Sequence, residues 1–289
     1  MSTAPPTPSD LLDVALDCAS AAVWLVHVDR PDRLRVETKS TATDLVTEMD
    51  RSSEALIREL IARRRPDDVV VGEEAGDGGQ GVSSRIDGGR IVDGAGVTWW
   101  VDPIDGTTNY VYDHPGYAVS IAAAIDGEVV AGVVADPTHG RTYAATLHGG
   151  ARCWGSVAGR SEDRSLRLGA PAPLERMLVA TGFAYDAEQR RVQGRVVAEL
   201  LPRIRDIRRM GAAALDLCSL AAGRVDGYYE AGLAVWDYAA GALIATEAGA
   251  RVGGLDGGAI RPGSVLAAHP ERFEQLRDLL SRLDDVEPG

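Results

Sequence analysis

Cysteine is scarce in this sequence, and long charge-free apolar segments are absent. The 289 residues include only Cys18, Cys153 and Cys218, an odd number at wide spacing that fits neither a disulfide framework nor a zinc site. The longest charge-free apolar runs, such as residues 117–125, are about half the ~18 residues that a membrane-spanning helix needs. The first ten residues carry no basic side chain, which argues against a secretory signal. These absences predict a soluble, cytoplasmic protein with no membrane partner.

Lysine is almost absent as well, because 29 of the 30 basic residues are arginine and the single lysine is Lys39. An ammonium is a compact point charge whereas a guanidinium is a planar fork, so Lys39 either marks a site that needs such a charge or survives by chance. The 43 acidic residues bring the net charge to -13. A field of this sign repels nucleic acid and suits cation binding, although a solvated acidic surface accounts for most of the excess.

Apolar periodicity and turn signals divide the chain into helices and short strands. The predicted helices repeat apolar side chains every three to four residues and cover 10–28, 50–64, 192–201, 211–222, 238–248 and 271–283. The predicted strands are short apolar segments and cover 69–71, 98–101, 118–125, 129–135, 177–181 and 225–230. Ser9 or Asp10 is the expected N-cap of the first helix, and Asp126-Gly127 is a hairpin turn signal.

The order of these elements indicates an α+β fold. Strands and helices are mixed without regular βαβ alternation, which favours packed layers over a single parallel sheet. The polar stretch 156–165 predicts a boundary between an N-terminal half, residues 1–160, and a C-terminal half, residues 161–289, within one compact unit. No internal repeat at a solenoid period is present.

A glycine-rich segment, residues 75–96, has no apolar period and predicts a mobile loop that closes over a site. Residues 76–81 within it match G-x-G-x-x-G literally. A dinucleotide site also requires the third glycine to open an amphipathic helix, and the residues after Gly81 have no apolar helical face. We therefore reject a nucleotide-binding interpretation of this match.

The most informative stretch is a carboxylate pair at a strand end. A hydrophobic strand delivers Asp102, Pro103 stops the strand, and Asp105 follows after a tight turn. Gly106 and Thr107 then begin a turn or helix whose free N–H groups can hold phosphate. Acidic ligands beside an anion site require cations between them, and oxygen ligands favour Mg²⁺.

Further carboxylates occupy similar positions. Glu73 and Glu74 follow a predicted strand, and Asp237 immediately precedes an apolar helix. Taken singly, the glutamates could lie in a solvated loop and Asp237 could be an ordinary N-cap. Taken together, they could supply the bridging and terminal ligands that paired metal ions need.

At this point the chain resembles the inositol monophosphatase family of Mg²⁺-dependent, lithium-sensitive phosphatases. The stretch 102–109, DPIDGTTN, looks like the first signature of that family, and 236–241, WDYAAG, followed by 247–250, looks like the second. Gly72-Glu73-Glu74 and Lys39-Ser40, with residues 44–47 and Asp50, match the remaining blocks in order and spacing. The resemblance covers about residues 10 to 270 and implies a layered α-β-α-β-α sandwich and a homodimer.

The resemblance also implies a role for each matching residue. Two to three Mg²⁺ ions per site would be held by Glu73, Asp102, the carbonyl of Ile104, Asp105 and Asp237. The catalytic residues that orient and activate the attacking water would be Asp50, Glu73 and Thr107. The substrate would be bound by Lys39, Gly106, Thr107, Gly211, Ala212, Ala213, Glu230 and Asp237. The implied reaction is hydrolysis of myo-inositol 1-phosphate by direct attack of a metal-activated water, with no phospho-enzyme.

Two departures leave the substrate open. Residues 181–185, TGFAY, resemble bacterial members and place an aromatic where animal members carry a polar contact, and Ala234 replaces a polar or basic residue. Histidinol phosphate, fructose 1,6-bisphosphate and phosphoadenosine phosphate are alternative substrates of related enzymes. From a different class, the chain could be a binding protein of the transcription machinery that retains the fold.

Overall fold

The computed structural model describes residues 5–74, 86–87, 90–91, 96–157, 159–260 and 263–284. Most of the predicted loop 75–96, with its G-x-G-x-x-G match at 76–81, lies outside the described residues. Within it, β4 (Ile86–Asp87) pairs antiparallel with β5 (Arg90–Ile91).

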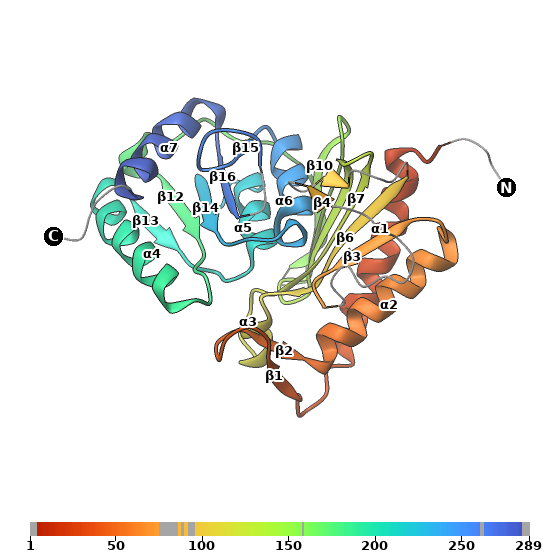
Figure 1. The fold of residues 1–289 in the computed structure, drawn as a ribbon. Helices are drawn as coiled ribbons and strands as arrows, with labels where there is room; N and C mark the ends of the chain where they lie inside the picture. The colour runs from red at the N-terminus through yellow and green to blue at the C-terminus, as the bar shows by residue number, and fades with distance from the viewer. Residues whose placement is uncertain are drawn as a thin grey trace.

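Five layers of alternating helices and sheets build the molecule (Figure 1). The outer layer at one end contains α1 (Pro8–Val23), which continues as a π-helix over Trp24–Val28, and α2 (Glu48–Arg64). The central layer contains α5 (Ala213–Ala221) and α6 (Val235–Glu247), and the outer layer at the other end contains α4 (Ala187–Leu200) and α7 (Pro270–Asp284). This order confirms the expected α-β-α-β-α sandwich.

The two sheets between these helices differ in topology. The first has the strand order β11-β10-β9-β8-β7-β6-β3, and only β3 and β6 run parallel. Its strands are β3 (Val69–Gly72), β6 (Val97–Asp105), β7 (Ala118–Ile125), β8 (Glu128–Asp136), β9 (Arg141–Thr146), β10 (Gly150–Val157) and β11 (Arg160–Leu166). The second has the order β13-β12-β14-β16-β15, with strands β12 (Leu178–Thr181), β13 (Asp206–Arg208), β14 (Gly227–Ala231), β15 (Arg251–Gly253) and β16 (Ser264–Ala268).

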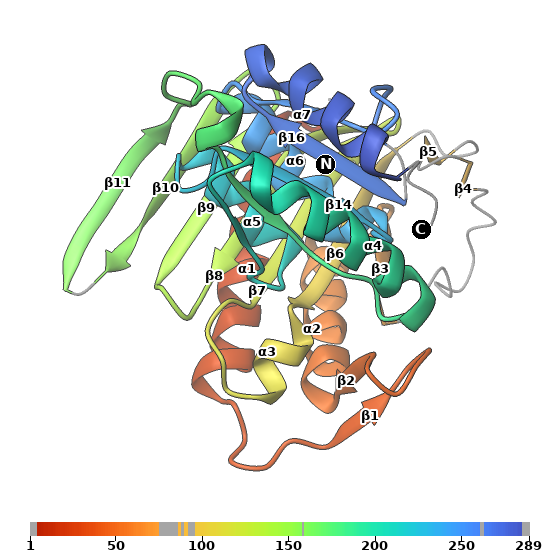
Figure 2. The same ribbon diagram turned by 90° about the vertical axis from the view of Figure 1, so that its left-hand side faces the viewer.

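Short elements complete the chain. A small hairpin of β1 (Val36–Thr38) and β2 (Leu45–Thr47) lies beside α3 (Thr107–Val111) below the sheets in Figure 2. Single 3-10 turns cover Leu174–Arg176 and Leu201–Arg203. The chain passes from the first sheet to the second between β11 and β12, which are consecutive strands in different sheets.

Four apolar clusters fill the four spaces between the five layers. Trp99 and Val101 on β6 face α1 and α2, whereas Trp100 on the same strand faces the central helices. Because successive strand side chains point to opposite faces, β6 is buried on both and carries a continuous apolar sequence. This buried strand fixes the position of the carboxylates at its end.

Three local predictions need correction. The strand at 98–101 does not stop at Pro103 but runs to Asp105, because a register shift between Asp102 and Asp105 places the proline where it breaks no ladder hydrogen bond. The N-cap of α1 is Thr7, and Asp10 lies at N3 of its capping box. Residues 156–165 are not a boundary segment but most of the β10–β11 hairpin.

The predicted division at residue 160 therefore falls inside the last hairpin of the first sheet. Polar side chains occupy successive positions there because β11 is an edge strand exposed along most of its length. The assignment of two halves to one catalytic unit stays a prediction.

From the sequence, no segment was expected to be long and apolar enough to cross a membrane. The helical segment Pro8–Val28, however, is long and apolar enough to do so by length and composition alone. Asp13 and Asp17 interrupt a charge-free run without making the segment polar. In the structure its apolar stripe, including Leu11, Ala15 and Ala22, packs on β7 and β8. A core helix meets the same criteria as a spanning one.

Candidate active site

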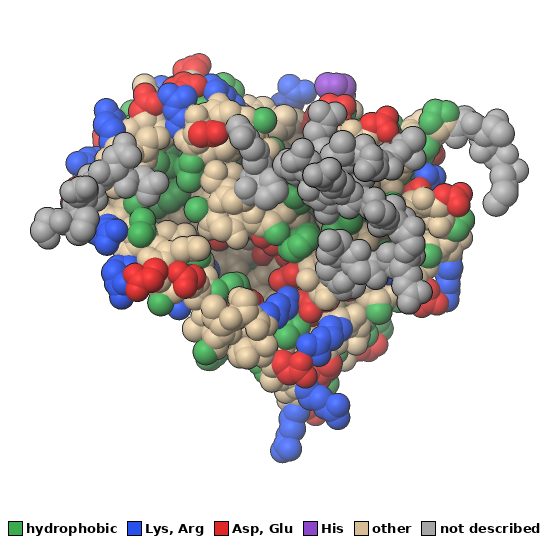
Figure 3. All heavy atoms as spheres, in the orientation of Figure 1, with side chains coloured by type: hydrophobic (Ala, Val, Ile, Leu, Met, Phe, Trp, Pro, Cys, Tyr) green, Lys and Arg blue, Asp and Glu red, His purple; other side chains and the backbone are tan. Residues whose placement is uncertain are grey.

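A cavity of about 540 Å³ opens where the ends of β3 and β6 meet the beginnings of α3, α5 and α6. Figure 3 shows a hollow between the two halves of the molecule with acidic side chains at its edge. The acidic residues that line the cavity are Asp44, Glu73, Asp102, Asp105, Asp186, Glu230 and Asp237, against two cationic side chains, Lys39 and Arg209. The cavity is therefore strongly acidic and suited to cations.

The structure brings nearly all predicted site residues to this cavity. Its wall includes Lys39, Glu73, Asp102, Ile104, Asp105, Gly106, Thr107, Gly211, Ala213, Glu230 and Asp237. Asp50 lies one side chain behind the wall and contacts it through Thr107. Ala212 does not line the cavity, contrary to expectation: as the N-cap of α5 it is 1% exposed, in contact with the Gly106 turn.

The two carboxylates at the end of β6 are fixed by backbone N–H groups. Asp102 Oδ1 accepts the N–H of Ile104 at 3.0 Å, which closes the turn between the acids. Asp105 accepts the N–H groups of Ala213 and Ala214 at 3.2 and 2.8 Å, at the beginning of α5. The positive end of α5 therefore holds a carboxylate of the first sheet, and this contact joins the two halves at the site.

Asp50 and Asp237 owe their positions to helix capping. Each is the N3 residue of its helix, and its Oδ2 accepts the backbone N–H of the N-cap residue, Thr47 at 2.8 Å and Ala234 at 2.7 Å. Asp237 is therefore not the N-cap that its place in the sequence suggested. The remaining oxygen, Oδ1, stays available to the site, and in Asp50 it accepts the Thr107 hydroxyl at 3.0 Å.

The left-handed turn at Gly106 places Thr107 beside these acids. Gly106 has a φ of 92°, and a Cβ there would lie 2.9 Å from the Gly116 carbonyl oxygen, so the position requires glycine. Thr107 begins α3, and N–H groups in a first helical turn have no acceptor within the helix. This turn supplies backbone donors at one edge of the acidic cavity.

Lys39 is the cation that balances the acids at the end of β3. Its Nζ lies 2.8 Å from Glu73 Oε1 and also contacts Glu74 Oε1. Burial lowers the pKa of Lys39, but the two glutamates more than compensate and raise it overall. The only lysine of the chain thus remains charged between two carboxylates.

The remaining carboxylates hold protons more tightly than isolated acids. Burial raises the pKa of Glu73 and of Asp237 to about 7. Burial and the charges of neighbouring acids raise the pKa of Asp102 and of Asp105 well above the usual range. Acids that are buried together without enough cations favour the binding of positive ions.

The donor set fits hard divalent cations, because every candidate ligand is a carboxylate or carbonyl oxygen. Among the residues that the structure describes, however, no three His, Cys, Asp or Glu side chains are already grouped as a metal site. Glu73 is engaged by Lys39, and Asp105 by two N–H groups. Ion binding therefore requires some of these carboxylates to turn towards a common point.

Several cavity residues were not predicted from the sequence. Arg209 lines the cavity with its guanidinium 5.7 Å from the centre of the Phe183 ring, and Gln189 reaches the wall from α4. Their approach depends on contacts between distant segments, and no spacing signal marks them. Phe183, Tyr185 and Ala234, identified as departures, do line the cavity.

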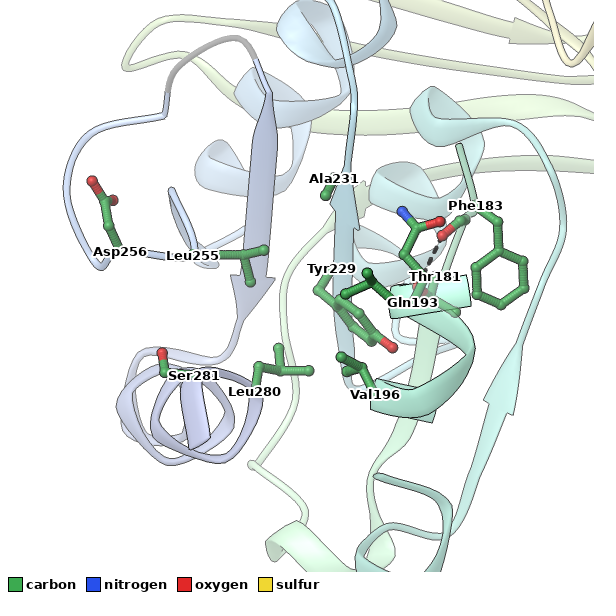
Figure 4. A pocket seen from close by; sticks show the side chains of 12 residues that line it. Thr181, Phe183, Gln193, Val196, Tyr229, Ala231, Leu255, Asp256, Leu280 and Ser281 are labelled. Carbon is green, nitrogen blue, oxygen red and sulfur yellow. Dashed lines mark hydrogen bonds between the residues drawn. The ribbon is translucent and has the colours of Figure 1, made fainter. Parts of the chain in front are cut away.

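A separate apolar cavity of about 320 Å³ lies between α4, α7 and β14 (Figure 4). It shares Phe183 and Ala231 with the acidic cavity. Leu255, Leu280 and Val196 dominate its wall in Figure 4, and Asp256 is its one acidic lining residue. Because it lacks a set of oxygen ligands, the acidic cavity is the better candidate for chemistry on phosphate.

Comparison with known proteins identifies the family of this chain. A family model described as the inositol monophosphatase family matches residues 7–283. The inositol-1-monophosphatase of Mycobacterium leprae is 44% identical over 276 residues, which cover 94% of this chain and 90% of the relative. A protein named Nus factor SuhB from Pasteurella multocida is 36% identical over 273 residues, covering 92% and 94%.

A solved structure shows the same fold. Mycobacterium tuberculosis SuhB aligns over 97% of this chain and 99% of its own, with a TM-score of 0.76 and 38% identity. The family is generally metal-dependent, and membership in it supports a phosphatase. This chain belongs to the inositol monophosphatase family.

Proposed function

We propose that this protein hydrolyses myo-inositol 1-phosphate to inositol and phosphate in a Mg²⁺-dependent reaction. The observation that carries the proposal is one cavity that combines buried oxygen ligands with the turn donors at Gly106 and Thr107. The name of the M. leprae relative supports the choice of substrate. Two to three Mg²⁺ ions, lithium sensitivity, a homodimer and a cytoplasmic location belong to the same proposal.

The ions would be held by Glu73, Asp102, Asp105, Asp237 and the carbonyl of Ile104. When bound, divalent ions lower the pKa of water and stabilise the oxygens that attack and leave phosphorus. The chain contributes the spacing of these oxygens, which is set by the end of β6 and the beginning of α6. Among the cavity-lining residues that the structure describes, Lys39 and Arg209 are the only cationic side chains that could compete with bound metal ions.

Thr107 and Asp50 orient the attacking water. The Thr107 hydroxyl lies 3.0 Å from Asp50 Oδ1 and 3.1 Å from the Ile104 carbonyl oxygen, and its one proton can be donated to either. When it donates to Asp50, the lone pairs of the threonine oxygen are left to accept a hydrogen bond from water. Asp50 Oδ2 is saturated by the N–H and hydroxyl of Thr47, at 2.8 and 2.6 Å. This fixed carboxylate gives the hydroxyl proton an acceptor away from the water, which is the arrangement that general-base assistance requires.

The alcohol part of the substrate is bound on the opposite side of the cavity. Glu230 is held by the Tyr228 hydroxyl at 2.9 Å and can accept hydrogen bonds from substrate hydroxyls. Gly182 lies against it, because a Cβ on this glycine would overlap the Glu230 carboxylate. Phe183 and Ala234 add apolar surface to this side of the cavity, which suits a substrate with an uncharged ring.

Phosphate release from myo-inositol 1-phosphate tests the proposal. With Mg²⁺, the wild-type protein should release phosphate, a chelator should stop the reaction, and D102N should lower kcat by at least ~10². D163N is the matched control, because Asp163 is exposed and pairs with Arg152 on the β10–β11 hairpin. Absence of turnover in folded, Mg²⁺-loaded protein would refute the inositol phosphate assignment.

A substrate panel separates the related activities. Histidinol phosphate, fructose 1,6-bisphosphate and phosphoadenosine phosphate should be hydrolysed with lower kcat/KM than inositol 1-phosphate. A higher value for any of them would transfer the assignment to that ester. Sedimentation velocity at micromolar concentration tests the dimer, and inhibition by lithium is measured in the same phosphate assay.

A second candidate function is binding to the transcription machinery. It is favoured by relatives that are named Nus factor SuhB, including the P. multocida protein. Such a function would not need the metal ligands, all of which this chain retains. If D102N and D105N proteins preserved the effect of the gene in cells, binding rather than hydrolysis would be the principal function.

A further inference from the structure

A side chain of α2 supports the turn that follows β3 from beneath. Glu54 is 2% exposed, and its Oε2 accepts the backbone N–H of Glu74 at 2.7 Å. Its Oε1 accepts the Nε of Arg58 at 2.8 Å, one turn further along α2. Hydrogen bonds to a buried carboxylate are among the strong ones, so the position of the Glu74 peptide is tightly defined.

The approach of Glu54 depends on a glycine. A Cβ on Gly72 would overlap the Glu54 carboxylate, so the side chain passes directly against the backbone at the end of β3. Arg58 extends the contact, because its Nη1 donates to the Val70 carbonyl at 2.7 Å. The two residues together clamp α2 onto the last residues of β3.

The turn held in this way presents the two glutamates to the cavity. Glu74 follows the clamped peptide, and its carboxylate contacts the ammonium of Lys39. The same ammonium lies 2.8 Å from Glu73, which reaches the cavity wall. A continuous series of contacts therefore runs from Glu54 to the Glu74 backbone, and from the Glu74 carboxylate through Lys39 to Glu73.

We propose that Glu54 is a positioning residue for cation binding, acting through the Glu74 peptide on Glu73. The proposal rests on the proposed function, in which Glu73 is a ligand. Glu54 is outside the cavity wall, and its carboxylate is occupied by Glu74 and Arg58. A residue one contact behind a ligand sets the orientation of that ligand and thereby the affinity for the ion.

A purely structural role must be separated from positioning. Two contacts of Glu54 bear on this test: the one to Arg58, which itself joins α2 to β3 at the Val70 carbonyl, and the one to the Glu74 N–H, which fixes the turn. E54L removes both contacts. R58M removes the bonds of Arg58 to Glu54 and to Val70 but leaves the bond between Glu54 and the Glu74 N–H, and E54Q retains a carbonyl oxygen for that N–H. E59Q is the matched control, because Glu59 lies on the same helix in an exposed ion pair with Arg63.

Two titrations measure the effect. Terbium, an oxygen-seeking cation, is followed by luminescence sensitised by Trp236, which lines the cavity beside Asp237. Mg²⁺ is followed by its half-saturation concentration in phosphate release, and thermal unfolding of each variant records stability. If the wild-type protein releases no phosphate, the proposed function fails, whereas the terbium titration still tests the role of Glu54.

E54L should raise both half-saturation concentrations by roughly tenfold or more, as loss of a residue behind a metal ligand does. R58M should lower the melting temperature but change half-saturation by less than about twofold, and E54Q should lie between the two. If E54L does not fold, E54D retains the charge beside Arg58, withdraws the carboxylate from Glu74 and should give the same rise. A folded E54L or E54D that binds cations like wild type, or an R58M rise equal to that of E54L, would overturn the proposal.

Discussion

Asp216 should make the folded protein less stable as the pH rises. It lies in α5, 1% exposed, and neither carboxyl oxygen has a hydrogen-bond partner among the residues that the structure describes. Burial and the charge of Glu230 raise the pKa of Asp216 well above its ordinary value of 3.8, and Arg209 opposes the shift. Asp105 and Tyr228 also face this carboxyl, and its charge raises the pKa of each of them.

The direction follows from the protons that each state binds. Because the pKa of Asp216 is higher in the folded state, folded protein retains a proton that unfolded protein releases above about pH 4. Its contribution to stability is complete below that pH and is lost as the pH rises towards the folded pKa. One proton changes the free energy of unfolding by at most about 1.4 kcal/mol per pH unit, or roughly 3 kcal/mol between pH 5.5 and 8.0.

D216N tests this reasoning, because the amide has the same shape and cannot ionise. Urea unfolding at pH 5.5 and 8.0, with Mg²⁺ fixed, should show wild type losing more stability than D216N over this interval, by up to about 3 kcal/mol. D163N is again the exposed control and should follow wild type. A difference between wild type and D216N that stays within about 0.5 kcal/mol would refute an unpaired, protonated Asp216.

Three further results are expected. T107V removes the hydroxyl on Asp50 at similar volume and should lower kcat by ~10²–10⁴ with little change in KM, whereas an unchanged kcat would exclude Thr107 from water activation. N109A removes an amide that donates to the Gly116 and Met210 carbonyls at 2.7 and 2.8 Å, and it should lower the free energy of unfolding by about 2 kcal/mol. An N109A protein as stable as wild type would show that these bonds contribute nothing. All three cysteines are buried, and burial raises the pKa of Cys18 to about 11, so a thiol reagent at pH 8 should label none before denaturation. Rapid labelling of native protein would contradict their burial.

Helical periodicity predicted most helices of the fold because each has one face on a buried layer. The hairpin at Asp126-Gly127 was also predictable, since both residues adopt the positive φ that such a turn requires, 49° and 81°. The strands from Arg141 to Leu166 were not predicted. In β11 every side chain before Leu166 is polar, so this exposed edge strand lacks the apolar alternation that marks a half-buried strand. Pairing order in the second sheet depends on contacts between β12, β13 and β14 that no local pattern encodes.

The same limit applies to the site. Asp102 and Asp105 could be identified because a short motif brings both acids to one strand end. Glu54 could not be identified in this way. Its role depends on a hydrogen bond from α2 to the Glu74 N–H after β3, and on the absence of a side chain at Gly72. The burial of Asp216 could not be predicted either, because it lies in a helix whose apolar pattern indicates only that the helix belongs to the core.

Two acids at helix beginnings explain how this cavity keeps carboxylates ready for cations. In Asp50 and in Asp237 one oxygen accepts the N–H of the N-cap residue, and this bond lowers the pKa of each group against the opposing effect of burial. The positive end of a helix dipole adds to the same effect. Asp102 has no such helix, and its pKa is raised further by burial and by Glu73. We therefore expect cations to bind first beside Asp237 and to reach Asp102 only as its proton is displaced. Terbium binding should then weaken below about pH 7 in wild type, where Asp237 takes up its proton, but already above pH 7 in D237N, where binding depends on Asp102. The same pH dependence in both proteins would contradict this order of binding.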